Sequence, residues 1–187
     1  KPWITEYNLF EREGVVAGTW AHGLYALMQT LLFMENQQTE LICYHNLTTS
    51  AQFAAIFNTN EGFNKSVKKK PTLLYGFTAA GYCLSLSGKA MSEGGNAIKL
   101  KFSNNQMQTA TRGQQYPSLT GWKINGGKGN KIIVANLSEN SVPADFSKVL
   151  SGTIAYSQLH AEPHIQVAEE KDVNRKKGTG AVITLPP

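Results

Sequence analysis

A strand–helix–strand pattern occupies residues 1–45, and it constrains the fold of this 187-residue chain more than any other feature. Residues 3–9 mix aromatic and β-branched side chains in alternation, which is typical of a short strand. Residues 20–35 carry apolar side chains at helical spacing, and Thr19 is placed to cap the first turn. Residues 40–45 have a continuous apolar middle, as in a strand buried on both faces of a parallel sheet. The pattern predicts a βαβ unit with a right-handed crossover.

A second helix is predicted over residues 71–87. Pro71 is tolerated in a first helical turn, and Gly88 is a suitable residue to end the helix. Apolar side chains recur along this segment, so the helix is expected to pack on the same sheet. Residues 51–57 are apolar, but their pattern favours neither a helix nor a strand.

The character of the sequence changes at residues 93–95, a Glu-Gly-Gly turn. Beyond it, short β-like segments follow one another at 98–102, 119–124, 131–137, 152–158 and 181–185. A Gly-rich loop at 125–130 predicts a hairpin. Short strands with frequent turns are typical of an antiparallel sandwich. The predicted fold class is therefore α/β plus all-β, with one domain over 1–92 and a β-sandwich domain over 93–187.

Charge and apolar patterning argue against nucleic-acid and membrane binding. The net charge is +5, but Lys68–Lys70 and Arg175–Lys177 hold six of the eighteen positive residues. Neither run is interleaved with aromatic residues, so solvated loops are favoured over a nucleic-acid surface. The longest apolar run, 24–34, contains Gln29 and Thr30 and is too short to span a bilayer. We therefore expect neither a nucleic-acid partner nor a membrane span.

The two cysteines are too few for a disulfide scaffold or a four-thiolate zinc site. Cys43 lies on a predicted strand and Cys83 in a predicted helix, so both are expected to be reduced thiols in the core. A disulfide between them stays open as the less favoured alternative. The four histidines are not placed with other ligands, and we expect no metal and no cofactor.

Glu6 is the residue that carries the most chemical information. It ends the first predicted strand beside aromatic and amide side chains, and α/β barrels place catalytic groups at the carboxyl ends of their strands. A strand-end glutamate in a surface salt bridge is the alternative, and position alone favours it.

Three motifs favour a catalytic role for Glu6 over a surface salt bridge. They are Trp3-Ile4-Thr5-Glu6-Tyr7-Asn8, Gly18-Thr19-Trp20-Ala21-His22-Gly23 and Cys43-Tyr44-His45-Asn46. Together they resemble the end of a clan A glycoside hydrolase, closest to α-L-arabinofuranosidases and β-xylosidases. The resemblance covers nearly the whole chain. It implies the last two βα units of a TIM barrel, followed by the antiparallel β-sandwich domain that these families carry. It also implies that Glu6 is the nucleophile of a retaining glycosidase.

The same resemblance implies that carbohydrate is bound near Glu6. Asn8 follows the nucleophile, Trp20 and His22 lie in the first turn of the next helix, and His45 ends the second strand. These four are the predicted substrate-binding residues, although interior packing is an equal alternative for Trp20 and His22. Alternation along the strand predicts that Tyr7 points away from the face used by Glu6.

The acid/base residue of such an enzyme comes from barrel strand four, and no glutamate of this chain matches it. We therefore expect the chain to be inactive alone and to need the N-terminal barrel half of the same enzyme, in a secreted or periplasmic setting. The alternative function is a non-catalytic β-sandwich module that binds carbohydrate or a partner. Trp122, Tyr116 and Tyr156 would be its contacts.

Overall fold

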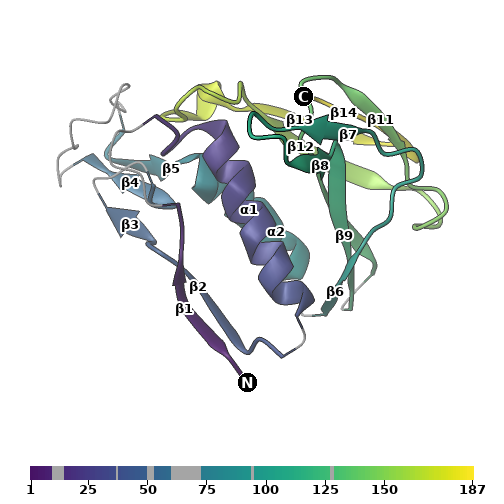
Figure 1. Ribbon diagram of the computed structural model, residues 1–187, viewed down its shortest axis with the longest axis horizontal. Helices are drawn as coiled ribbons and strands as arrows, with labels where there is room; N and C mark the ends of the chain where they lie inside the picture. Colours follow the sequence, from purple (N-terminus) through teal and green to yellow (C-terminus); the bar gives the residue numbers. More distant parts are fainter. Residues whose placement is uncertain (10–14, 37, 50–52, 60–72, 94, 127–128) are drawn as a thin grey trace. The chain divides into compact units, whose positions relative to one another are not determined.

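The computed structural model describes residues 1–9, 15–36, 38–49, 53–59, 73–93, 95–126 and 129–187 (Figure 1). The described chain has a mixed α/β architecture, with two α-helices and many short strands in small sheets. It divides into two compact units. Residues 1–89 and 161–174 form the first unit, and residues 90–160 and 175–187 form the second.

Residues 161–174 were assigned to the sandwich by sequence, but in the structure they belong to the first unit. They lie against the start of helix α1 (Trp20–Glu35). The N–H groups of Trp20 and Ala21 donate to the carbonyls of Ile165 (3.3 Å) and Pro163 (3.0 Å). The first N–H groups of a helix have no partner inside it, so this segment satisfies donors that would otherwise be buried unpaired. Such a pairing between distant segments leaves no local sequence signal.

The predicted βαβ unit is present. Strand β1 (Trp3–Tyr7) pairs in parallel with strand β2 (Leu41–Tyr44), and α1 connects them (Figure 1). The Thr19 hydroxyl accepts a hydrogen bond from the His22 N–H, which confirms the predicted cap. Between Ile4 and Tyr7 the register shifts, so β1 advances three residues while β2 advances two. This bulge leaves Thr5 and Glu6 both exposed between two half-buried neighbours.

The second helix begins later than the sequence predicts. Helix α2 spans Ala79–Met91, and residues Tyr75–Phe77 form strand β5 instead. Strand β5 pairs antiparallel with β4 (Ile56–Asn58), which in turn pairs in parallel with β3 (Thr48–Thr49). The prediction was wrong here because strand pairing overrides the helical spacing of the apolar residues. Pro71, the predicted start, lies outside the described residues.

Helix α2 approaches the backbone of Ala55 closely at Gly81. A Cβ atom on Gly81 would lie 2.0 Å from the Ala55 carbonyl oxygen, whereas one on Gly88 in the same helix would meet nothing within 4 Å. We predict that Gly81→Ala lowers the free energy of unfolding by about 1–3 kcal/mol through overpacking. The matched variant Gly88→Ala should raise it by about 0.5–1 kcal/mol, because alanine is the better helix former. Urea denaturation followed by circular dichroism measures both, and equal effects would contradict the close approach.

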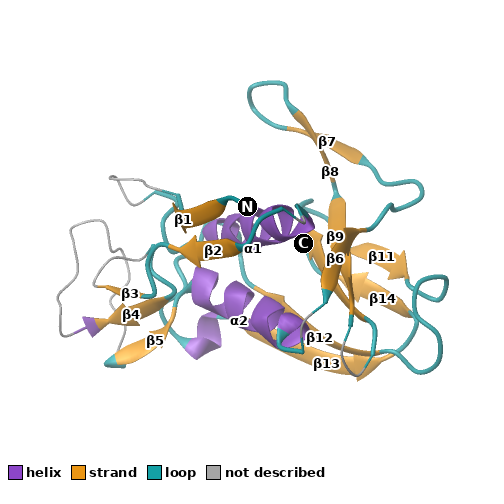
Figure 2. Cartoon of the chain, turned by 90° about the horizontal axis from the view of Figure 1, so that it is seen from below, coloured by secondary structure: helices purple, strands orange, loops and turns teal. Residues whose placement is uncertain are grey.

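The second unit is built from short strands in four small sheets. Strand β9 (Leu119–Asn125) is central, between β6 (Asn96–Lys99) and β10 (Lys131–Asn136), and both neighbours are antiparallel to it. The remaining pairs are β7 (Met107–Thr109) with β8 (Gln115–Pro117), β11 (Val142–Asp145) with β14 (Val182–Leu185), and β12 (Ala155–His160) with β13 (Asn174–Thr179). The predicted Gly-rich hairpin is the connection between β9 and β10. Figure 2 shows the β7–β8 hairpin standing away from the β9 sheet.

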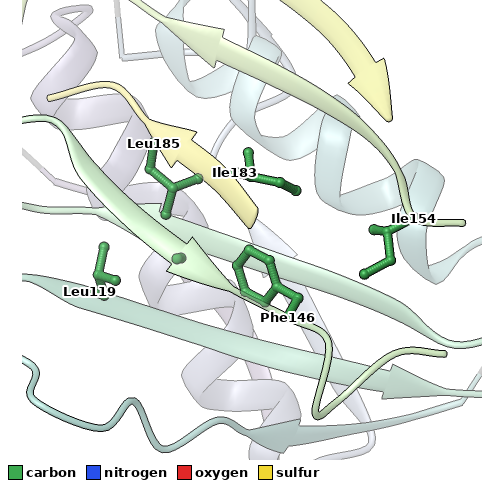
Figure 3. Close-up of a cluster of buried hydrophobic side chains, with 6 residues drawn as sticks. Leu119, Phe146, Ile154, Ile183 and Leu185 are labelled. Carbon is green, nitrogen blue, oxygen red and sulfur yellow. The ribbon is translucent and has the colours of Figure 1, made fainter. Parts of the chain in front are cut away.

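A compact apolar cluster holds the second unit together (Figure 3). Leu119, Phe146, Ile154, Ile183 and Leu185 are all buried and point toward one another, and Ala144 completes the group. These residues come from β9, β11, β14 and the segments between strands, so this cluster joins separate sheets into one core.

One of the two basic runs lies in a described strand. Arg175, Lys176 and Lys177 are exposed on β13, whereas the run Lys68–Lys70 lies outside the described residues.

Neither α1 nor α2 has the length and apolar character needed to cross a membrane.

Candidate functional site

The ends of β1 and β2 bring two predicted site residues together. Glu6 lies at the end of β1 and His45 follows the end of β2, and the His45 Nδ1 is 3.3 Å from the Glu6 Oε2. Both side chains are open to solvent, at 70% exposure for Glu6 and 51% for His45. The His45 N–H donates to the Tyr7 carbonyl (3.0 Å), which extends the strand pairing to this point. We refer to these two residues as the Glu6–His45 pair.

Tyr7 and Tyr44 lie on the side of the two strands that α1 covers. The Tyr7 ring packs edge-on against Phe33 and against Tyr44, and its hydroxyl hydrogen-bonds to the Thr30 hydroxyl. Burial raises the pKa of Tyr7 and the pKa of Tyr44, so both phenols stay neutral. The prediction that Tyr7 points away from the face used by Glu6 is confirmed.

The Asn8 side chain ties the ends of the two strands together. Its Nδ2 donates to the carbonyl of His45 and, at 2.9 Å, to the carbonyl of Phe53. Its Oδ1 accepts from the Leu9 N–H at 2.7 Å. Asn8 thereby positions the backbone that carries His45, and its predicted contact with substrate stays a prediction.

His22 supports Asn8 from inside the unit. Its side chain is fully buried, at 0% exposure. The Gly18 N–H donates to Nδ1 (3.1 Å), so the ring proton is on Nε2, which donates to the Asn8 Oδ1 at 2.7 Å. A backbone donor thereby sets the tautomer, and the imidazole orients the amide that holds His45.

Trp20 also lies inside the unit, with 3% of its surface exposed. It begins α1 where the segment 161–174 covers the helix. The sequence predicts Trp20 and His22 at the open end of the strands, with interior packing as an equal alternative. Both side chains are buried, which favours packing and positioning over direct contact with sugar.

Phe53 is a site residue that sequence reasoning missed. Its ring stacks on the His45 imidazole, with centroids 6.2 Å apart and planes 13° from parallel. Its carbonyl accepts hydrogen bonds from Asn8 and from the Tyr44 hydroxyl (2.6 Å). Phe53 lies in the apolar stretch that had no assigned element, and only its position after the second strand could have indicated a role.

We predict that Asn8→Ala destabilises the first unit by about 2 kcal/mol, because the buried His22 Nε2–H would lose its acceptor. Urea denaturation measures the change, and amide hydrogen exchange at His45 should become faster. Asn36→Ala is the matched control, since its exposed amide accepts from the N–H of the nearby Gln38. Its effect should stay below about 0.5 kcal/mol. Equal losses in the two variants would contradict the positioning role of Asn8.

The cysteines, a metal centre and Trp122 were also considered from the sequence, and none of them contributes to this site. Cys43 and Cys83 are free thiols, and burial raises the pKa of Cys83 to about 12. Within the described residues, no three His, Cys, Asp or Glu side chains are grouped so that they could hold a metal ion. Trp122, predicted as a contact of the alternative binding module, is 0% exposed and cannot meet a ligand.

The site thus consists of an exposed carboxylate and imidazole at the carboxyl ends of two parallel strands, supported by the buried His22 and the half-buried Asn8. Compared with models of known protein families the chain matches none, and the search of curated proteins likewise finds no match.

Proposed function

We propose that this chain is the C-terminal portion of a retaining glycoside hydrolase that acts on oligosaccharide or polysaccharide, with Glu6 as its nucleophile. The observation that carries the proposal is the Glu6–His45 pair. An exposed carboxylate ends one parallel strand, and a histidine ends the next strand 3.3 Å away. In βα barrels the catalytic groups occupy these strand ends.

The surroundings of Glu6 suit a nucleophile. The carboxylate is exposed, and it lies on β1 next to a tyrosine that packs on α1. An attacking carboxylate must be open to the substrate, and the Glu6 side chain is exposed beside a histidine. The bulge in β1 leaves Glu6 exposed beside Thr5, whereas Ile4 and Tyr7 on either side of them are half-buried.

The reaction proceeds in two steps. Glu6 attacks the anomeric carbon, the glycosidic C–O bond breaks, and a glycosyl ester forms on the carboxylate while an acid protonates the leaving oxygen. Water then attacks the same carbon, its proton passes to the conjugate base of that acid, and Glu6 is released as a carboxylate. His45 holds the Glu6 oxygen in place, and Asn8 and His22 fix the backbone of His45.

The acid/base residue is proposed to come from the N-terminal barrel half, about 5 Å from Glu6 in the assembled enzyme. In this proposal the first unit supplies the last two βα units of the barrel and the second unit is the following β-sandwich. The enzyme would be secreted or periplasmic, where its polysaccharide substrates occur. The chain by itself should not turn over substrate.

Trapping the glycosyl ester in the longer enzyme tests the proposal. An aryl 2-deoxy-2-fluoro glycoside of arabinofuranose or xylose should form the ester by loss of the phenolate, and the fluorine should slow its hydrolysis. Mass spectrometry of the intact protein should show one added fluorosugar, and peptide mapping should place it on Glu6. A label on another carboxylate, or turnover of a matching aryl glycoside without any trapped ester, would overturn the assignment.

A further inference from the structure

A hollow of about 720 Å³ lies wholly within the second unit, and nothing in the proposed reaction uses it. One wall is the connection between β6 and β7, residues 100–106, and the other is residues 138–149, which include β11. Its volume falls in the range of small-molecule sites, about 300–1,000 Å³. We call it the Asn/Ser groove.

The groove presents neutral hydrogen-bonding side chains. Five of its lining side chains, hydroxyls and amides, have no hydrogen-bond partner within the described parts of the chain: Ser103, Asn104, Gln106, Asn140 and Ser141. Each amide offers donors and an acceptor, and each hydroxyl offers both. Such groups match the hydroxyls of a sugar, which also donate and accept.

Charge contributes little to the groove. Among its described lining residues, Lys101 and Lys148 are the cationic ones and Asp145 is the acidic one. The backbone N–H of Ser147 donates to the Asp145 Oδ1 (2.9 Å) and lowers the pKa of that carboxyl, so Asp145 stays ionised and offsets one lysine. A groove of this composition favours a neutral ligand over a phosphate or sulfate group.

Two amide side chains, the half-buried Asn105 and the buried Asn136, hold the walls in position. On one wall, the Asn105 Nδ2 donates to the Leu119 carbonyl (2.7 Å), and its Oδ1 accepts from the Leu119 N–H (2.9 Å). On the other, the Asn136 Nδ2 donates to the carbonyls of Asn140 (2.7 Å) and Pro186 (2.8 Å). These bonds tie the loops to β9 and to the C-terminal segment, so the groove is formed before a ligand arrives and less ordering is needed on binding.

The floor of the groove is apolar. Leu119, Ala144 and Phe146 line it and also belong to the buried cluster of the second unit (Figure 3). Phe102 packs against the same cluster. An apolar floor under polar walls suits a sugar ring, whose faces carry C–H groups and whose edge carries hydroxyls.

We propose that the Asn/Ser groove binds a neutral oligosaccharide. The site is independent of the Glu6–His45 pair and does not rest on the proposed hydrolase function. It also differs from the predicted contact at Trp122, which is buried.

The test uses the whole 187-residue chain labelled with ¹⁵N and titrated with xylotetraose, arabinotetraose and cellotetraose. At least one sugar should shift, saturably, the side-chain amide signals of Asn104, Gln106 and Asn140. The double variant Asn104→Ala/Asn140→Ala should weaken binding at least about tenfold, since it removes two neutral hydrogen-bonding groups. Gln114 carries an exposed amide at the β7–β8 turn, outside the groove. The control variant Gln114→Ala should bind the sugar with the affinity of the wild-type chain.

Three results would overturn the proposal. They are no saturable shift with any of the three sugars, shifts confined to residues outside the groove, and displacement of the sugar by inorganic sulfate. The amide shifts of the wild-type chain test the proposal even if the double variant fails to fold. Because trapping reports on Glu6 and these shifts report on the groove, failure of either proposal leaves the other standing.

Discussion

Replacing Glu6 by glutamine in the longer enzyme should lower kcat for an aryl glycoside by about a thousandfold or more. An amide of the same shape cannot form the glycosyl ester, so the two-step route is closed. The fold should be unaffected, because the Glu6 side chain is 70% exposed and its nearest ionisable partner, His45, is also exposed. Initial rates of phenolate release measure the effect.

Glu40→Gln is the matched control for this loss. Glu40 precedes β2, at the opposite end of the same strand pair, and its Oε2 accepts from the Trp3 Nε1 at 3.0 Å. The substitution makes the same chemical change on an exposed carboxylate far along the strands from His45. It should leave kcat within about a factor of two, as expected for a surface change. Full turnover by the Glu6→Gln enzyme would exclude Glu6 as the nucleophile.

Trp122→Ala should lower the free energy of unfolding of the second unit by about 3–5 kcal/mol. Trp122 is 0% exposed on the central strand β9, where it pairs with Ile133 of β10 and with Lys99 of β6. The Lys99 ammonium lies 5.7 Å from the centroid of the indole. Truncation would remove the largest fully buried side chain among the described residues and leave a cavity in the core.

Urea denaturation combined with amide hydrogen exchange in β9 and β10 measures this change. Small domains have total stabilities of about 5–15 kcal/mol, so the variant should be partly unfolded under mild conditions. Met107→Ala, which truncates an exposed apolar side chain on β7, should cost less than about 0.5 kcal/mol. A loss below about 1 kcal/mol for Trp122→Ala would show that the indole is not part of a close-packed core.

The location of Glu6 and His45 at one edge was predictable because it depends on a local rule. Both residues lie at the ends of apolar strands, and strands joined by one helix run parallel, so their carboxyl ends meet at one edge. The 3.3 Å contact between the two side chains was not predicted and comes from the structure. Thr19 and the bounds of α1 were predictable for a similar reason, since caps and apolar spacing act within a few residues.

The roles of Trp20 and His22 were not predictable, because they depend on a segment distant in the sequence. Residues 161–174 pair with the backbone at the start of α1, where both side chains are buried. The late start of α2 was also not predictable, because it too depends on contact with another segment of the chain. Residues 75–77 have helical spacing, but β4 offers them a strand partner, and pairing with it outweighs local preference.

The sequence by itself determined the strand–helix–strand order, the cap, the hairpin between β9 and β10, and the placement of Glu6 and His45 at strand ends. These features rest on spacing and turn chemistry, which act between near neighbours. Only the tertiary structure decided that His22 and Asn8 form an interior support, that Phe53 stacks on His45, and that the second unit contains the Asn/Ser groove. Burial and hydrogen bonding between distant segments depend on which surfaces the folded chain brings together, and no local pattern encodes that choice.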